Sequence, residues 1–309
     1  MTTRITFAMP FYSGLGYLES ALRSLQHQTT AEWKAIVVDD AGPEPAEGLA
    51  ARFADPRISY VRNDVNLGLA GNWNKALSLA DTEFVTIFHC DDELAAHYAS
   101  TMINLMERQP QAVAGHCRVQ LIDDNGQPTR TLADAVKGWL TPRFTNDIAT
   151  SGDSGLRTLA RANWIFCPTL CFRRALLPAA PFDARWQFVV DLDAMKRLIV
   201  AGHTIDGTSE VAYRYRRHHH NQTRLLGASF RRHDEELEFA KLTCEEAAAI
   251  GWNLTARTSR RAAVARINLL VESAIALGQR DTGRFRGALR RATTGRRPAG
   301  DVGGGPSPR

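Results

Sequence analysis

The stretch that decides the fold is Ile5-Thr6-Phe7-Ala8-Met9-Pro10-Phe11-Tyr12-Ser13-Gly14-Leu15-Gly16. An apolar, strand-like run is followed here by a glycine-containing turn, and the turn opens a segment with helical spacing. The first 120 residues repeat this alternation of strand and helix at short intervals. Such alternation predicts an α/β fold in which a mostly parallel sheet is flanked by helices.

The individual elements are expected as follows. Strands are predicted at residues 5–9, 34–39, 58–62, 84–89, 112–118, 169–173 and 210–217. Apolar side chains at helical spacing predict three helices between the first five strands, and further helices at 154–161, 191–201 and from 230 onward. Asp124-Asn125-Gly126 predicts a hairpin turn, and residues 127–165 read as an irregular segment because prolines and glycines interrupt them.

Three regions follow from this pattern. Residues 1–223 are predicted to form the α/β domain, and residues 224–294 a helical C-terminal extension. Residues 295–309 are rich in glycine and proline and are predicted to be a disordered tail.

The composition is that of an ordinary globular protein. Of 309 residues, 44% are hydrophobic and 23% are charged, which excludes disorder throughout. No apolar run reaches the roughly 18 residues of a membrane helix, and no signal peptide is visible, so a cytoplasmic location is expected. Five cysteines without paired spacing argue against a disulfide framework or a structural zinc site.

The positive charge lies at the C-terminal end. Residues 257–309 hold twelve arginines and three acids, a net charge of +9, which leaves −4 of the total +5 for residues 1–256. A nucleic-acid enzyme more often carries basic residues around its cleft, so nucleic acid is not expected as a partner. A solvated charged surface is the default interpretation of the basic helices, with a peripheral membrane contact or a homo-oligomer contact as alternatives. The arginines do not form one basic face opposite a strong apolar face, which argues against the membrane contact.

The turn after the first strand contains neither of two common nucleotide-binding motifs. Gly14 and Gly16 match the first two glycines of the dinucleotide-binding motif Gly-x-Gly-x-x-Gly, but the third position is Glu19. The phosphate-binding loop with Gly-Lys-Ser/Thr is absent as well. These glycines are therefore interpreted as turn residues.

Two pairs of acids follow predicted strands. Asp39 and Asp40 end the second strand, where a carboxylate can accept hydrogen bonds from a base imide or ribose hydroxyls; an Asx-type turn or helix cap is the alternative. Asp91 and Asp92 follow the strand at 84–89, and such oxygen ligands suit Mg²⁺ or Mn²⁺. The alternative there is the N-terminus of a helix over 93–109, which acids also favour.

Taken together, the motifs resemble family 2 glycosyltransferases with the GT-A fold. The matching pieces occur in the family's order: Pro10-Phe11-Tyr12, Val37-Val38-Asp39-Asp40, Asn66-x-Gly68-x-x-x-Asn72-Trp73-Asn74 and His89-Cys90-Asp91-Asp92. More loosely, Asp191-Leu192-Asp193 resembles the segment that holds the family's catalytic base, and residues 213–218 the strand after it.

This resemblance implies a metal-dependent, inverting transfer of sugar from a UDP-, dTDP- or GDP-linked donor to an unknown acceptor. The implied donor-site residues are Pro10, Phe11, Tyr12, Asp39, Asp40, Asn66, Gly68, Asn74, His89 and Asp91. Asp91, Asp92 and His218 would hold the metal, and Asp191 would be the catalytic base.

The sequence departs from the family pattern at two positions. His89 stands where the first acid of the metal motif often sits, so it is expected to contact ribose or phosphate. Val190 replaces the usual glutamate before the base, which makes Asp193 a competing candidate; on a helix, Asp191 and Asp193 lie on different faces.

The acceptor side is less defined. Trp164 is the candidate for stacking against an acceptor, with core packing as the alternative. Other functions remain open: a nucleotidyltransferase that uses a nucleoside triphosphate, or a non-catalytic protein that binds nucleotide sugars or a partner. The two-carboxylate design of glycoside hydrolases is a contrasting mechanism that the residues alone do not exclude.

Overall fold

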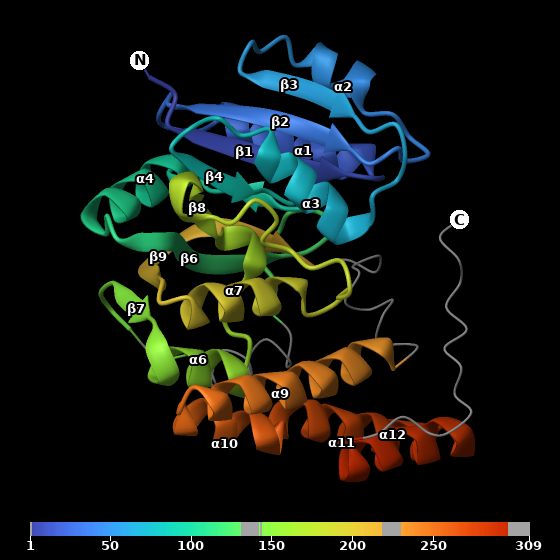
Figure 1. Ribbon diagram of the computed structural model, residues 1–309. Coiled ribbons are helices and arrows are strands. Elements are labelled where there is room, and N and C mark those ends of the chain that lie inside the picture. Colours follow the sequence, from blue (N-terminus) through green and yellow to red (C-terminus); the bar gives the residue numbers. More distant parts are fainter. Residues whose placement is uncertain (1, 131–141, 143, 218–229, 296–309) are drawn as a thin grey trace. The chain divides into compact units, whose positions relative to one another are not determined.

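The computed structural model describes residues 2–130, 142, 144–217 and 230–295 (Figure 1). These residues form a nine-stranded sheet with flanking helices and a helical C-terminal part, as the α/β prediction requires. The chain groups into two compact units. The first contains residues 1–152, 164–185 and 190–218, and the second contains residues 153–163, 186–189 and 219–309.

One half of the sheet is parallel. Its strand order is β3 (Ile58–Arg62), β2 (Trp33–Asp39), β1 (Ile5–Phe11) and β4 (Phe84–Ile87), and these strands lie side by side in Figure 1. All four coincide with predicted strands. Their side chains are largely buried, except on the edge strand β3, because helices cover the sheet.

The other half is mixed. β8 (Cys171–Arg173) runs antiparallel to β4 and to β6 (Ala112–Ile122), whereas β9 (Thr204–Arg216) runs parallel to β6. β5 (Glu93–Leu94) and β7 (Ile148–Thr150) are antiparallel to β9. The sheet is therefore less uniformly parallel than expected, because strands of two or three residues carry no readable alternation.

Helices of the first unit close the core. They are α1 (Leu15–Gln26), α2 (Glu47–Arg52), α3 (Gly68–Ser78), α4 (Tyr98–Arg108) and α7 (Val190–Val200), with short 3₁₀ turns at Cys167–Thr169 and Arg174–Leu176. The buried faces of α1 and α4 pack against the apolar side chains of β1. The helix proposed as an alternative for 93–109 is wrong at its start, because residues 93–94 pair with β9 and α4 begins at Tyr98.

The predicted hairpin at residues 124–126 is present. The backbone N–H of Asp123 donates to the carbonyl of Gln127 at 2.8 Å, and that of Gly126 donates to Asp123 at 3.0 Å. Ile122 and Pro128 form an antiparallel bridge beyond the turn. The hairpin extends the end of β6 past the edge of the sheet.

The second unit is helical. It holds most of α6 (Gly152–Arg161) together with α9 (Arg231–Ala249), α10 (Asn253–Arg261), α11 (Ala263–Gly278) and α12 (Thr282–Thr294). The carboxylate of Asp153 accepts hydrogen bonds from the N–H groups of Leu254 and Thr255, at 2.9 and 2.8 Å, and so caps α10. The predicted boundary near residue 223 and the predicted tail at 295–309, except residue 295 itself, lie outside the described residues.

None of the described helices combines the length and the apolar character that a bilayer crossing requires.

A buried histidine in the first unit leads to a pH prediction. His116 on β6 is 3% exposed, its Nε2 has no hydrogen-bond partner among the described residues, and its ring lies 5.2 Å from that of Trp164. Burial lowers the pKa of His116 to about 4. The unfolded chain, with a histidine pKa of about 6.5, binds the proton first as the pH falls. The free energy of unfolding should therefore decrease between pH 6.5 and 4, by up to about 3 kcal/mol from this group.

Urea titrations across that pH range test this contribution. The His116→Gln variant should lose less stability on acidification than the wild type, whereas the exposed His97→Gln variant should keep the wild-type slope. A wild-type slope in His116→Gln would contradict the expectation.

Candidate active site

The carboxyl ends of β1, β2 and β4 meet at one edge of the sheet. Because these strands are parallel neighbours, the residues that follow them are brought together there. The N–H of Asp40, after β2, donates to the carbonyl of Phe11 at 2.8 Å, and the Cys90 thiol, after β4, donates to the carbonyl of Pro10 at 3.2 Å. The predicted donor-site segments thus lie side by side.

Asp39 is completely buried, and four groups donate to its carboxylate. They are the N–H groups of Gly42 and Ala46 at 3.1 and 3.3 Å, the Tyr60 hydroxyl at 2.7 Å and the Arg62 guanidinium at 2.6 Å. None of these four donors lies two residues on, as an Asx turn requires, but the local backbone bonds favour the structural alternative for Asp39 over ligand binding. Asp39 therefore fixes the backbone of the loop after β2.

Asp40 holds the loop between β3 and α3, residues 63–67, through hydrogen bonds to its carboxylate. One oxygen accepts from the Asn63 amide at 2.9 Å and from the N–H of Leu67 at 2.8 Å, and the other accepts from the N–H of Gly68 at 3.0 Å. Gly68 has a φ of +72°, a conformation that favours glycine, and it begins α3. The conformation of this loop thus depends on a single buried carboxylate.

The loops after β1 and β2 touch at Gly42. A Cβ atom at this position would lie 1.8 Å from the carbonyl oxygen of Tyr12 and 2.8 Å from its carbonyl carbon. The contact is between two stretches of backbone, so a flexible side chain cannot relieve it. The ring of Tyr12 is 41% exposed and is therefore available to a ligand.

Among the described residues there is one group of potential metal ligands, and it lies in the loop after β4. Ligand atoms of His89, Asp91 and Asp92 all lie within 4.8 Å of one another. Burial lowers the pKa of His89, which favours the neutral imidazole that binds metals, and its Nε2 has no hydrogen-bond partner among the residues described. Two carboxylates and an unpartnered imidazole nitrogen at this spacing fit a divalent cation such as Mn²⁺ or Mg²⁺.

Asp92 is held in place by β9. The Tyr213 hydroxyl donates to one of its oxygens at 2.9 Å, and the backbone N–H of Arg216 donates to the other at 2.7 Å. Burial, followed by the nearby Asp91 charge, raises the pKa of Asp92 well above its usual range. A bound cation would offset this repulsion between two adjacent carboxylates.

Arg216 joins the loop after β4, residues 89–92, to the hairpin at residues 123–127. We term this loop the acidic loop. Its guanidinium donates to the Asp91 carbonyl at 2.8 Å and to the carbonyls of Asp123 and Asp124, both at 2.9 Å. It also pairs with Glu93 at the edge of the site. The Arg216 side chain is almost completely buried, and its hydrogen bonds hold the acidic loop against the hairpin.

His89 also packs against Trp73 of α3, with the ring centroids 5.2 Å apart and the rings tilted by 39°. This contact connects the Asn-x-Gly segment at the start of α3 with the acidic loop. The two motifs are adjacent here although they are far apart in sequence.

The two candidate bases have different surroundings. Asp191 lies half-buried in the first turn of α7, and its charge, together with that of Asp92, adds to the burial that raises the pKa of the Cys167 thiol. Asp193 is completely buried, with Arg197 at 2.8 Å and Lys196 at 3.4 Å. The charges of Asp191 and Asp92 thus both act on the Cys167 thiol, whereas Asp193 pairs with cations of its own helix.

The remaining predicted residues lie in different environments. Asn66 is exposed and accepts a hydrogen bond from the N–H of Gly68 at 2.8 Å, whereas the Asn74 amide both donates to and accepts from the backbone of Phe182. Trp164 is 4% exposed against His116, which favours the packing alternative over acceptor stacking. His218 lies outside the described residues.

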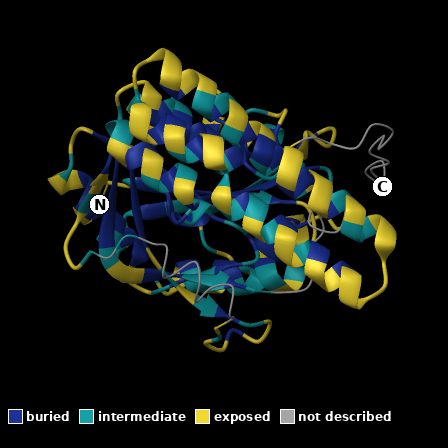
Figure 2. Ribbon diagram, turned by 90° about the horizontal axis from the view of Figure 1, so that it is seen from below, coloured by how far each residue is buried: buried dark blue, intermediate teal, exposed yellow. Residues whose placement is uncertain are grey.

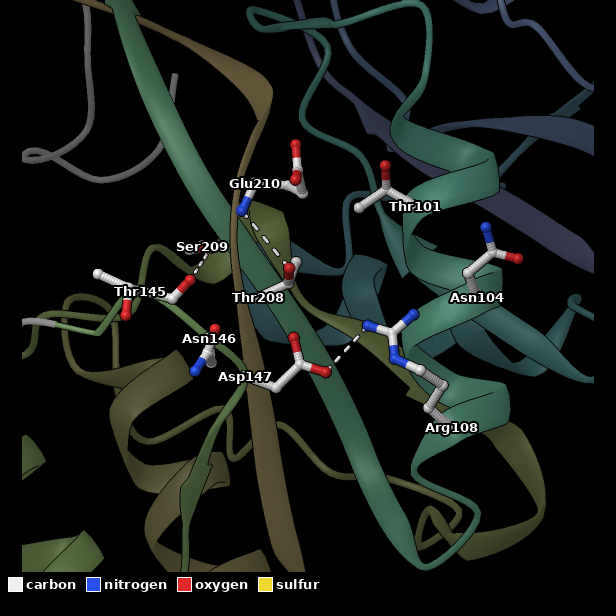
Figure 3. A pocket seen from close by; sticks show the side chains of 9 residues that line it. All are labelled: Thr101, Asn104, Arg108, Thr145, Asn146, Asp147, Thr208, Ser209 and Glu210. Atoms are coloured by element: carbon white, nitrogen blue, oxygen red, sulfur yellow. Dashed lines mark hydrogen bonds and ion pairs between the residues drawn. The ribbon is translucent and has the colours of Figure 1, made fainter.

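A pocket of about 630 Å³ is lined by none of the predicted site residues (Figure 3). Its walls come from α4, β9 and residues 145–147, and Arg108 and Asp147 form an ion pair of 2.9 Å within it. Its polar, open lining makes it a surface hollow separate from the acidic loop.

Sequence reasoning missed the residues that support the site. Asn63 and Asn72 are buried beside Asp40, and Asn72 also donates to the Val38 carbonyl at 3.1 Å. Tyr213 and Arg216 hold Asp92 from more than 120 residues away. The resemblance placed the strand at residues 213–218 near the metal through His218, but it assigned no role to Tyr213 or Arg216.

Comparison with known proteins identifies the family. Residues 6–171, more than half of the chain, match Glycosyl transferase family 2. This chain belongs to that family, as the motifs indicated. Among curated relatives, Uncharacterized protein MT1568 of Mycobacterium tuberculosis is 30% identical over 207 residues, covering 63% of this chain and 62% of that protein. The glucosyltransferase WfgD of Escherichia coli is 28% identical over 102 residues, 33% of this chain and 40% of WfgD. This chain spans less than two thirds of the length of these relatives.

Solved structures share the fold. S. aureus TarS 1-349 in complex with UDP-GlcNAc superposes with a TM-score of 0.55 at 14% identity, covering 95% of this chain and 92% of that one. Mannosyltransferase PcManGT from Pyrobaculum calidifontis, in complex with GDP-Man and Mn²⁺, gives a TM-score of 0.56 at 15% identity, with coverage of 96% and 88%. The GT-A-like fold predicted from the sequence is thereby confirmed.

Proposed function

We propose that this protein transfers a sugar from a nucleoside-diphosphate sugar to an acceptor hydroxyl, with inversion and with a divalent cation. The observation that carries the proposal is the His89, Asp91 and Asp92 cluster at the edge where β1, β2 and β4 end. Membership of glycosyl transferase family 2 supports the reaction class. The ligands named in the titles of the two structural neighbours support the donor class.

The donor would lie across the loops after β1 and β2. We assign the nucleoside to the surface formed by Pro10, Tyr12, Asn66 and Gly68. Phe11, which the sequence also placed in the donor site, is only 2% exposed and belongs to the hydrophobic core. Asp39 and Asp40 keep this surface in shape by holding the two loops through buried hydrogen bonds. Asn74 ties the middle of α3 to the backbone of Phe182.

The diphosphate would lie at the acidic loop. Asp91 and Asp92, with His89, would hold the cation, and His218, which lies outside the described residues, is proposed as a further ligand from the sequence motif. The cation, when bound, would neutralise charge that develops on the leaving diphosphate. Tyr213 and Arg216 keep Asp92 oriented for this role. Mn²⁺ or Mg²⁺ suits a ligand set dominated by carboxylates.

Asp191 would be the general base. As the acceptor oxygen forms a bond to the anomeric carbon, the bond from that carbon to the diphosphate oxygen breaks, and Asp191 takes the acceptor's proton. One displacement from the opposite face inverts the anomeric centre. Asp191 and Asp92 both act electrostatically on the Cys167 thiol, which supports this role, and the ion pairs of Asp193 argue against the competing assignment.

The acceptor class is suggested by two relatives. WfgD is named for transfer to a sugar on diphosphoundecaprenol, and a Campylobacter jejuni relative is named for transfer to a sugar chain on PP-undecaprenol. Lipid-diphosphate-linked sugars are therefore the acceptors to test first.

A thermal-shift panel tests the donor site. UDP, dTDP and GDP are each added with and without Mn²⁺, and ADP with Mn²⁺ serves as the control nucleotide. One of the three should raise the melting temperature by several degrees only when Mn²⁺ is present, since a ligand at 100 times its Kd adds about 2.7 kcal/mol of stability. The absence of any shift from folded protein would contradict the proposal.

A further inference from the structure

Helix α11 is apolar on two opposite faces. Its buried face consists of Ala265, Leu269, Ser273 and Ala276, and Leu269 packs with Leu237 of α9 and Ala288 of α12 in the small core of the second unit. A helix with a single covered side normally presents polar residues to water. The polar residues Arg266, Asn268 and Glu272 instead lie at the borders of the buried face.

The opposite side forms what we term the α11 apolar face. It consists of Ile267, Leu270, Val271, Ala274, Ile275 and Leu277. The five large side chains are between 46% and 59% exposed. At 100° per residue all six side chains fall within one arc, and the two other exposed residues in that arc, Ala263 and Gly278, are small. No charged side chain interrupts this arc. Exposed residues of the helices appear in yellow in Figure 2.

Exposed arginines lie at both ends of this face. Arg260 and Arg261 immediately precede α11, and Arg280 follows it. The helix between them is about 22 Å long, from the rise of 1.5 Å per residue. The nearby acids are engaged within the unit: Glu272 pairs with Arg284 at 2.9 Å, and Asp281 accepts the N–H of Arg284 at 2.8 Å as the cap of α12.

We propose that the α11 apolar face binds the surface of an anionic phospholipid bilayer. An exposed aliphatic stripe can insert among the acyl chains, and the arginines beyond its two ends can contact anionic head groups. The partner must be apolar in the middle and negative at the rim, and an anionic bilayer provides both.

A second copy of the chain fits this surface less well. Two α11 helices packed face to face in parallel would place Arg260 and Arg261 against the same residues of the other copy. Packed antiparallel, they would place these arginines against Arg280 of the other copy. Either arrangement brings like charges together at both ends of the contact, which is unfavourable.

Vesicle co-sedimentation of the full chain tests the proposal. The protein should sediment with phosphatidylglycerol/phosphatidylcholine vesicles, and much less with phosphatidylcholine vesicles alone or at high salt. The double variant Ile267→Gln/Val271→Gln should reduce the partition coefficient by at least about tenfold, because each large aliphatic side chain contributes about that factor when buried. The control Val211→Gln removes an equally exposed aliphatic side chain from β9 and should bind like the wild type.

Three results would overturn the proposal. They are no binding to anionic vesicles, equal binding by the double variant, or a concentration-dependent dimer that the double variant abolishes. Thermal melting of each variant checks that it remains folded. The measurement needs neither donor nor turnover, so its outcome is independent of the proposed glycosyl transfer.

Discussion

The Asp91→Asn variant is expected to lose at least about 10³-fold in glycosyl transfer while its fold remains intact. Asp91 contributes a carboxylate to the candidate cation site, and its backbone carbonyl, which Arg216 contacts, is unchanged by the substitution. A loss of this size corresponds to about 4 kcal/mol, within the several kcal/mol that a catalytic cation supplies. Steady-state turnover at saturating Mn²⁺, with thermal melting of the same sample, measures both quantities.

The matched control is Asp81→Asn. Asp81 precedes β4, at the opposite edge of the sheet, where its exposed side chain pairs with Lys34. This control should retain full activity, since an exposed ion pair contributes little to stability. Two results would show that Asp91 does not bind the cation. They are normal turnover by the Asp91→Asn variant, or a thermal shift of this variant that still depends on Mn²⁺.

The Asp191→Asn variant should remove transfer but leave donor binding nearly unchanged. A general base contributes about 10² to 10⁴-fold to the rate, and the amide of asparagine cannot take the acceptor's proton. The expected pattern is a loss in kcat with a thermal shift by donor plus Mn²⁺ close to that of the wild type. The chain tolerates this change because Asp191 is only half-buried.

The comparison with Asp193→Asn distinguishes the two candidate bases. Asp193 is buried beside Lys196, which is also buried, and removing one charge of such a pair costs about 3 kcal/mol. This variant should therefore melt at a lower temperature while keeping its kcat at temperatures where it is folded. The opposite result would be unchanged transfer by Asp191→Asn and an inactive but stable Asp193→Asn variant. It would make Asp193 the general base in place of Asp191.

The fold was largely predictable because its first half repeats a strong pattern. β1, β2 and β3 are runs of five to seven residues bounded by turns, and the helices α1 and α3, which follow β1 and β3, have clear apolar faces. The short strands β5 and β7 were not predictable, because their position depends on pairing with β9 more than 50 residues later. Pairing across such distances has no local signature in the chain.

The candidate site was predictable where residues follow strands. Parallel neighbours must end at the same edge, so Asp39, Asp40 and Asp91 could be grouped from sequence alone. What each side chain does in that group depends on its partners. The four donors of Asp39 and the contact of Arg216 with the acidic loop arise from residues brought together by folding.

The backbone contact at Gly42 limits how this protein can be redesigned. A Cβ atom there would occupy the space of the Tyr12 carbonyl. The backbones of the two loops that flank the proposed nucleoside surface can therefore pack together only if position 42 has no side chain. An engineer who seeks a new donor preference can vary the side chain of Tyr12, which projects into solvent. A library randomised at position 42, in contrast, should return glycine almost alone, so new specificity has to arise from the neighbouring positions.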